Sequence, residues 1–209
     1  MVCISDSEGT GRLQLIKNSN DRIRVQGLMV NDRANFSPYL EQELRSDHAG
    51  ETGAVYIYKG IIAIARLSND LEMISFAKNH GATESEHLKL LETVLSKDLQ
   101  SRLLLLWRIA GWLIGAVPAL FGRKAVYATI AAVETFVEQH YQAQIDHLLL
   151  NRSHQGLLQL LQRCQADEID HKHEAAIALG DAKPGFILRI WCSLMDIGSR
   201  GAVAICRRV

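Results

Sequence analysis

The chain has 209 residues, 48% of them hydrophobic, and its 23 basic and 23 acidic side chains give a formal net charge of zero. A chain of this length supports one domain with a sizeable core. Because there is no excess of basic side chains to contact phosphates, the composition argues against a nucleic-acid-binding protein. The hydrophobic content lies at the upper edge for a soluble protein, which indicates contact with something apolar.

The cysteines and the N-terminus bear on the cellular compartment. The four cysteines form no Cys-x-x-Cys pair and are predicted to be reduced thiols: Cys3, Cys164, Cys192 and Cys206. The first 20 residues lack a basic start followed by an apolar run, so no secretory signal is expected. The sequence therefore predicts a bacterial cytoplasmic protein.

In chain order, residues 1–35 are expected to form an irregular arm with a short strand-like run at Arg22–Leu28. Ser37 and Pro38 predict the start of the first helix, because serine is a preferred N-cap and proline is favoured at the first helical position. Apolar residues at helical spacing continue to Ser68, where this helix is predicted to end.

A second helix is predicted to follow the break at Ser68-Asn69-Asp70 and to continue to about Leu95. Two further long helices, at about Ala125–Leu150 and His154–Leu179, repeat the apolar pattern of the first two. Gly180 is expected to end the last of these, followed by a turn at Pro184-Gly185.

Two more segments, at about 102–122 and 186–208, are predicted to be apolar or amphipathic helices that contact a membrane. The first includes Leu103–Phe121, the most apolar stretch, with Trp107 and Trp112. Its longest uncharged run, Ile109–Gly122, is shorter than the ~20 residues that a spanning helix needs. The pattern therefore favours an interfacial helix, with tryptophans at headgroup depth and arginines towards anionic lipid.

The most informative motif is a Glu-x-x-His step that occurs twice, at Glu84/His87 and at Glu168/His171. Residues three apart share one face of a helix, so each pair can hold one metal ion. Glu51 lies 33 residues before Glu84, and Glu134 lies 34 residues before Glu168, each alone within an apolar stripe. Two such steps with one glutamate from each of two other helices are the ligand pattern of ferritin-like di-iron or di-manganese bundles.

Charge balance supports a pair of metal ions at this cluster. Four inward glutamates and two inward histidines would be costly to bury unless they bound a cation. Carboxylates and imidazoles without thiolates favour iron or manganese over a structural zinc ion. A single Glu-x-x-His step is most often a chance occurrence on a helix surface. Two steps at matched spacing, each behind an inward glutamate, predict a di-metal site.

Several neighbouring residues allow two interpretations each. His48, His80, His140 and His173 either donate to a ligand or serve packing or the surface. Tyr58 and Tyr141, each seven residues after a candidate ligand glutamate, either move protons or electrons or only pack. Glu138 either neutralises a charge or faces solvent. Asp47 and Asp170 are predicted to accept hydrogen bonds from the far nitrogens of the ligand histidines.

The sequence resembles the demethoxyubiquinone hydroxylase family of ubiquinone biosynthesis. The likeness is carried by Asp47-His48-Ala49-Gly50-Glu51, by Ile57-Tyr58-Lys59-Gly60, by Glu84-Ser85-Glu86-His87-Leu88 and by Asp167-Glu168-Ile169-Asp170-His171. It extends from about Leu40 to the C-terminus, and Thr52 and Val55-Tyr56 depart from the expected pattern. The resemblance implies an all-α, ferritin-like four-helix bundle built from a twofold-repeated helix pair plus two additional apolar or amphipathic helices.

By the same resemblance, two iron ions are held by six ligands, with Glu84 and Glu168 as bridges: Glu51, Glu84, His87, Glu134, Glu168 and His171. The implied enzyme is an O₂-dependent monooxygenase that hydroxylates the ring of 2-polyprenyl-3-methyl-6-methoxy-1,4-benzoquinol. It would act as a peripheral protein at the cytoplasmic face of the inner membrane. The apolar helices are also compatible with a homo-oligomer or with accessory quinone-biosynthesis proteins.

Three alternatives are weighed against this reading. A ferritin-like iron-storage or peroxide-scavenging protein would use the same ligands, but it needs no apolar 19-residue stretch with two tryptophans. A di-iron oxygenase that acts on a different quinone is a closer rival. A purely structural bundle would have to bury its glutamates without metal, which their desolvation cost disfavours.

Overall fold

The computed structural model describes residues 36–181 and 185–209, and these form helices joined by short connections. The predicted arm at 1–35, the strand-like run at Arg22–Leu28 and residue Pro184 of the predicted turn lie outside the described residues. The helices of the described part are α1 (Pro38–Leu67), α2 (Leu71–Val94), the short 3₁₀ helix η2 (Lys97–Leu99), α3 (Leu104–Ala119), α4 (Arg123–Asn151), α5 (Gln155–Leu179) and α6 (Phe186–Cys206).

Local sequence signals set the ends of several helices. The Ser37 hydroxyl accepts a hydrogen bond from the Leu40 amide (3.3 Å) and caps α1, with Pro38 at its start, which confirms the predicted N-terminus. Asp70 caps α2 by accepting from the Met73 amide (3.0 Å). Gly180 ends α5 with a φ of 68°, a left-handed value that glycine adopts without a steric cost, as predicted.

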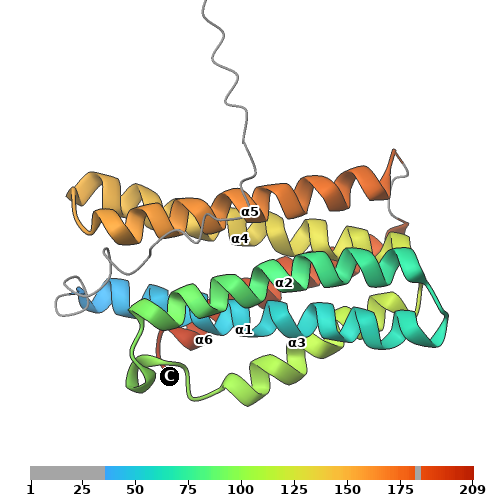
Figure 1. Cartoon of the computed structure of the whole chain (residues 1–209), viewed down its shortest axis with the longest axis horizontal. Helices are drawn as coiled ribbons and strands as arrows, with labels where there is room; N and C mark the ends of the chain where they lie inside the picture. The colour runs from blue at the N-terminus through green and yellow to red at the C-terminus, as the bar shows by residue number, and fades with distance from the viewer. Residues whose placement is uncertain (1–35, 182–184) are drawn as a thin grey trace, which may run out of the picture.

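The four long helices form a bundle of two hairpins, α1–α2 and α4–α5, which lie side by side in Figure 1. In the described part of the chain, this arrangement confirms the all-α, ferritin-like fold with a repeated helix pair. The predicted boundaries agree closely for the long helices. The apolar helix α3 is shorter than the predicted 102–122, because Pro118 lies near its end and Gly122 leaves the helical conformation with a φ of 93°.

The helices α3 and α6 lie outside the four-helix bundle and pack against it. Both contact α1 and α4. The approach of α3 to α1 is close: a Cβ at Gly115 would lie 1.9 Å from the Ile57 carbonyl oxygen, so only glycine allows this distance. Within the described residues, none of the helices is long and apolar enough to cross a membrane.

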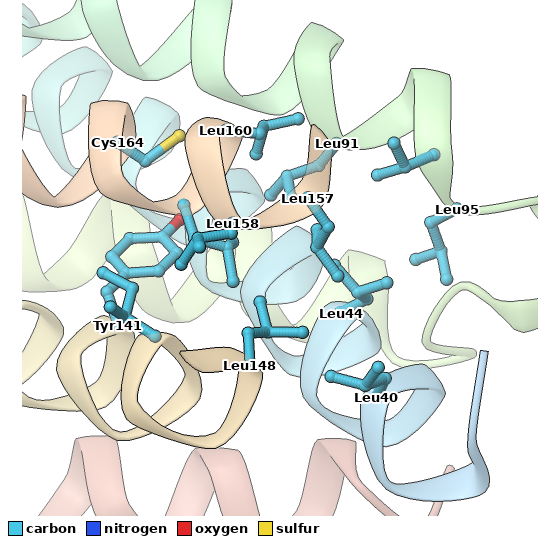
Figure 2. Close-up of a cluster of buried hydrophobic side chains, with 13 residues drawn as sticks. Leu40, Leu44, Leu91, Leu95, Tyr141, Leu148, Leu157, Leu158, Leu160 and Cys164 are labelled. Carbon is cyan, nitrogen blue, oxygen red and sulfur yellow. The ribbon is translucent and has the colours of Figure 1, made fainter. Parts of the chain in front are cut away.

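Two apolar clusters fill the bundle, one towards each end. The first, drawn in Figure 2, joins α1, α2, α4 and α5 through leucines such as Leu44, Leu91 and Leu161. The second joins the same helices at the other end through residues such as Ile61, Met73 and Ile130. The six candidate metal ligands occupy the interior between the two clusters, where the packed side chains keep them from water.

Candidate metal centre

The structure brings all six predicted ligands together in the middle of the bundle. Glu51 comes from α1, Glu134 from α4, and the two Glu-x-x-His steps come from α2 and α5. All six side chains are buried, with exposed fractions of 6% or less. Four helices therefore each contribute at least one ligand to a single interior site.

The ligands fall into two groups that share two members. One group is Glu51, Glu84, His87 and Glu168, and the other is Glu84, Glu134, Glu168 and His171. Within each group one ligand atom per residue lies within 4.8 Å of all the others, a spacing that could hold one metal ion. Because Glu84 and Glu168 belong to both groups, their carboxylates are placed to bridge two ions.

The orientation of the two shared carboxylates fits bridging. Glu84 directs Oε2 towards His87 Nδ1 (3.6 Å) and Oε1 towards His171 Nδ1 (3.0 Å). Glu168 directs Oε1 towards His87 Nδ1 (3.1 Å) and Oε2 towards His171 Nδ1 (3.4 Å). Each carboxylate thus offers one oxygen to each half of the site.

Seven polar atoms of this cluster are buried without a hydrogen-bond partner. They are Glu51 Oε2, both carboxylate oxygens of Glu84 and of Glu168, His87 Nδ1 and His171 Nδ1. Buried polar atoms are normally satisfied, so a group of orphaned atoms that face one another needs an explanation. A pair of metal ions would engage all seven, and the donor set of carboxylates and imidazoles suits iron or manganese.

Without metal, the site perturbs the proton affinities of its members strongly. Burial, followed by the charge of neighbouring glutamates, raises the pKa of Glu51 and of Glu134 well above the usual range. Burial also acts to raise the pKa of Glu84, but its close contacts with the imidazoles of His171 and His87 outweigh burial and lower the pKa. Burial acts to lower the pKa of His171, whereas its contacts with Glu168 and Glu84 raise it to about 11.

Two tyrosines hold the two ligand glutamates that are not shared. Tyr141 on α4 donates to Glu51 Oε1 on α1 at 2.5 Å, and Tyr58 on α1 donates to Glu134 Oε1 on α4 at 3.2 Å. Each tyrosine therefore orients the glutamate of the opposite repeat, rather than the one seven residues before it. This contact with a ligand goes beyond simple packing of the two rings.

The prediction that Asp47 and Asp170 accept hydrogen bonds from the ligand histidines is wrong, because the structure shows other contacts. The far nitrogen of His87, Nε2, contacts Asp167 Oδ2 at 2.9 Å. Asp170 is exposed, because it lies two residues beyond Glu168 and so on another side of α5. Asp47 instead contacts His140 Nε2 (3.0 Å) and accepts from Gln144 Nε2 (2.8 Å). The sequence signal that could have identified Asp167 is its position directly before the inward-facing Glu168.

The ambiguous histidines separate into different environments. His80 stacks on the ring of the ligand His171, with centroids 4.2 Å apart. His48 is buried near Glu92 (3.7 Å), and its ring nitrogens form no hydrogen bond. His140 belongs to the polar group around Asp47, and His173 is exposed.

The remaining ambiguous residue, Glu138, faces outward from the metal ligands. It forms an ion pair with Lys172 of α5. Its carboxylate is therefore neutralised by a surface cation and serves the contact between α4 and α5.

A cavity of about 310 Å³ leads to the ligands from the side of α3 and α6. Glu51, Glu84, Glu134 and Glu168 line its inner end. The rest of the wall is largely apolar and includes Ile114 of α3 and Val203 of α6, and the polar residues Asp47 and His140 also line it. Its volume and character are those of a small-molecule site.

A four-helix bundle that buries two Glu-x-x-His steps and two further glutamates has the ligand pattern of the ferritin-like class of dinuclear carboxylate proteins. Comparison with known proteins specifies the family. The family model for ubiquinone biosynthesis protein COQ7 matches residues 38–206, so the chain belongs to that family.

Similar curated proteins carry related names. The chain is 30% identical over 180 residues to NADPH-dependent 3-demethoxyubiquinone 3-hydroxylase, mitochondrial, of Caenorhabditis elegans, covering 84% of this chain and 94% of the relative. It is 27% identical over 197 residues to the human protein of the same name, covering 92% and 88%. It is 36% identical over 112 residues to 3-demethoxyubiquinol 3-hydroxylase of Rhodospirillum rubrum, covering 52% and 51%.

Proposed function

We propose that this protein is a di-iron monooxygenase that hydroxylates the ring of 3-demethoxyubiquinol, a polyprenyl benzoquinol, in ubiquinone biosynthesis. The observation that carries the proposal is the apolar cavity with four ligand carboxylates at its inner end. A quinol ring that entered between α3 and α6 would reach the metal site through a wall that suits an isoprenoid substituent. Family membership and the names of the relatives support the same reaction.

Each ligand has an assigned role in this proposal. Glu51 and His87 would hold one iron, Glu134 and His171 the other, and Glu84 and Glu168 would bridge them. The bound ferrous pair would supply the activation of O₂. The two apolar clusters exclude water from the ligands, and the two tyrosine hydroxyls keep one oxygen of Glu51 and of Glu134 oriented. The protein would thereby confine the chemistry to the ring that occupies the cavity.

We also propose that residues 36–209 act as one domain that binds the cytoplasmic surface of the inner membrane through α3 and α6. Both helices expose large apolar side chains, among them Leu105 and Phe121 around α3 and Phe186 and Ile187 on α6. Exposed apolar surface of this extent marks an interaction site. Exposed cations next to it, Arg108 and Lys124, suit anionic headgroups. A substrate with a polyprenyl tail would pass from the bilayer into the cavity between these helices.

The apolar cavity distinguishes this proposal from an iron-storage protein. Hydrated metal ions need a polar route, whereas most of the wall between α3, α6 and the ligands is apolar. A hydroxylase for a different quinone would use the same cavity and remains the principal alternative.

The decisive experiment is complementation of a bacterial strain that lacks demethoxyubiquinol hydroxylation, with quinones profiled by mass spectrometry. The wild-type chain should restore ubiquinone and deplete the demethoxy intermediate. Glu168→Ala, which removes a bridging ligand, should not restore it, whereas Asp170→Ala on the exposed side of α5 should. An unchanged intermediate pool with well-expressed wild-type protein would refute the proposed substrate.

A further inference from the structure

His80 is a buried residue of α2 that lies one turn before the ligand Glu84 and is not itself a ligand. Its exposed fraction is 2%. One face of its imidazole stacks on the ligand His171, with ring centroids 4.2 Å apart and an interplanar angle of 28°. Phe76 also contacts the ring, with centroids 4.1 Å apart. The imidazole is therefore fixed in place and in contact with the ring of a ligand.

The two ring nitrogens of His80 contact different residues, Glu174 through Nε2 and Tyr58 through Nδ1. Nε2 lies 2.9 Å from Oε2 of Glu174, a glutamate on the surface of α5. Nδ1 lies 3.4 Å from the hydroxyl of Tyr58, which also lies 3.2 Å from Oε1 of the ligand Glu134. A carboxylate only accepts, so the Glu174 contact places the Nε2 proton and leaves the Nδ1 lone pair facing the Tyr58 hydroxyl.

The Tyr58 hydroxyl consequently has two acceptors, Glu134 Oε1 and His80 Nδ1. It carries one proton and can donate it to one of them at a time. If a metal ion engages Glu134 Oε1, the hydroxyl has an alternative partner and need not be left unsatisfied in the interior. His80 therefore supports the group of ligands that contains Glu134 and His171 in two ways, through the ring of His171 and through Tyr58 to Glu134.

The other group, which contains Glu51 and His87, is supported differently. The position that corresponds to His80 in the repeat, four residues before Glu168, is Cys164, a buried thiol. Here Tyr141 lies at 2.5 Å from Glu51, and the far nitrogen of His87 is held by Asp167 at 2.9 Å. Figure 2 shows Cys164 and Tyr141 among the apolar side chains at this end of the bundle. The repeat thus places a carboxylate support behind one ligand histidine and an imidazole beside the other.

We propose that His80, oriented by Glu174, is a positioning residue for one of the two metal positions, the one formed with Glu134 and His171. The inference rests on the proposed dinuclear metal centre. It predicts that the two positions differ in affinity and that their affinities can be changed separately. Groups that orient metal ligands typically contribute 10- to 100-fold to metal affinity.

The test is equilibrium binding of Mn²⁺ to the full chain, with free Mn²⁺ measured by electron paramagnetic resonance. Wild-type protein should bind two ions and give the signal of a coupled pair. His80→Phe keeps an aromatic ring between Phe76 and His171 but removes both hydrogen bonds. The variant should bind the ion at the position of Glu51 and His87 with wild-type affinity. It should bind the ion at the position of Glu134 and His171 about tenfold or more weakly. The coupled signal should then appear only at higher Mn²⁺ concentrations.

Three further variants separate positioning from folding: two controls and one milder change to the same contact. His48→Phe changes a buried histidine of α1 whose nitrogens form no hydrogen bond, and it should leave both affinities unchanged. Glu174→Ala changes only a surface carboxylate. It should lower the affinity for the ion at the position of Glu134 and His171, as His80→Phe does, but by a smaller factor. Asp170→Ala, an exposed carboxylate of the same helix, should have no effect.

The inference would be overturned if His80→Phe bound both ions with the same affinities as wild type. It would also be overturned if the variant lost affinity equally at both positions. If His80→Phe fails to fold, Glu174→Ala decides by the same criterion. If wild-type protein binds fewer than two ions, the proposed metal centre itself fails, which is a different result from an unaltered second affinity in the variants.

Discussion

At the scale of single residues, the site depends on contacts between the two repeats as much as on the ligands. Tyr58 and Tyr141 each bond the glutamate of the other hairpin, and the far nitrogen of His87 on α2 is held by Asp167 on α5. A carboxylate behind a ligand histidine fixes its tautomer and raises its basicity. In this protein, that support comes from the residue next to Glu168, the glutamate proposed to bridge the two metal ions.

Asp167→Ala should therefore weaken metal binding at the position formed with His87. The variant removes the acceptor 2.9 Å from His87 Nε2, and we expect a loss of about tenfold in the affinity for that ion. Calorimetric titration with Mn²⁺ would measure it. Asp170→Ala is the matched control, since Asp170 is exposed on the same helix. Equal behaviour of the two variants would contradict the assigned role of Asp167.

At the scale of elements, the position of α3 depends on the absence of side chains. Gly115 of α3 approaches the backbone of α1 so closely that a Cβ would lie 1.9 Å from the Ile57 carbonyl oxygen. A backbone atom cannot move aside as a side chain can, so any larger residue must displace the helix. Because α3 forms one wall of the cavity, this contact also sets the shape of the proposed substrate site.

Gly115→Ala should destabilise the protein by about 1–3 kcal/mol, the usual cost of overpacking. Gly198→Ala on α6 is the control, because its Cβ would meet nothing within 4 Å. That variant should be neutral or stabilising by up to about 1 kcal/mol, since alanine favours a helix over glycine. Urea unfolding of the two variants measures both values. A stable Gly115→Ala variant would show that α3 can shift freely.

The apolar faces of α3 and α6 make a second prediction at this scale. Phe121→Glu combined with Ile187→Glu should reduce binding to vesicles that contain phosphatidylglycerol by about tenfold, because each change replaces exposed apolar surface with a charge that anionic lipid repels. Flotation assays measure the bound fraction. Leu150→Glu is the control, an equally exposed change at the end of α4. Binding that is insensitive to the double variant would argue against this surface.

At the scale of the whole molecule, the buried cluster links stability to pH and to metal. Burial raises the pKa of Glu51 and of Glu134, so in the metal-free fold these carboxyls keep protons that the unfolded chain has lost. Their contribution to stability is therefore fully present below the ordinary carboxyl pKa and is lost as the pH rises through the raised pKa values. Metal ions need the deprotonated ligands, so binding strengthens with pH over the same window.

The difference in Tm between metal-loaded and metal-free protein should accordingly grow as the pH rises above the ordinary carboxyl pKa. At a metal concentration near 100 times Kd, each bound ion adds about 2.7 kcal/mol to stability. Differential scanning calorimetry with Mn²⁺ and with a chelator measures the difference at each pH. A constant or shrinking difference would show that the buried carboxyls do not control binding.

The sequence alone determined the elements and the candidate ligand set. Apolar periodicity, Ser37-Pro38 and Gly180 predicted helices that the structure confirms, because these signals act within a few residues of the chain. The two Glu-x-x-His steps were recognisable for the same reason: both members lie on one helix, and the repeat spacing locates the two remaining glutamates.

Only the tertiary structure decided which side chains support those ligands. Three features depend on how α1, α2, α4 and α5 are rotated and shifted against one another. They are the contact of His87 with Asp167 rather than Asp170, the hydrogen bonds from each tyrosine to the glutamate of the other hairpin, and the contacts of His80 with Tyr58 and Glu174. That register is set by interlocking of the apolar clusters at the two ends of the bundle. Periodicity within one helix carries no information about which residue of another helix will face it.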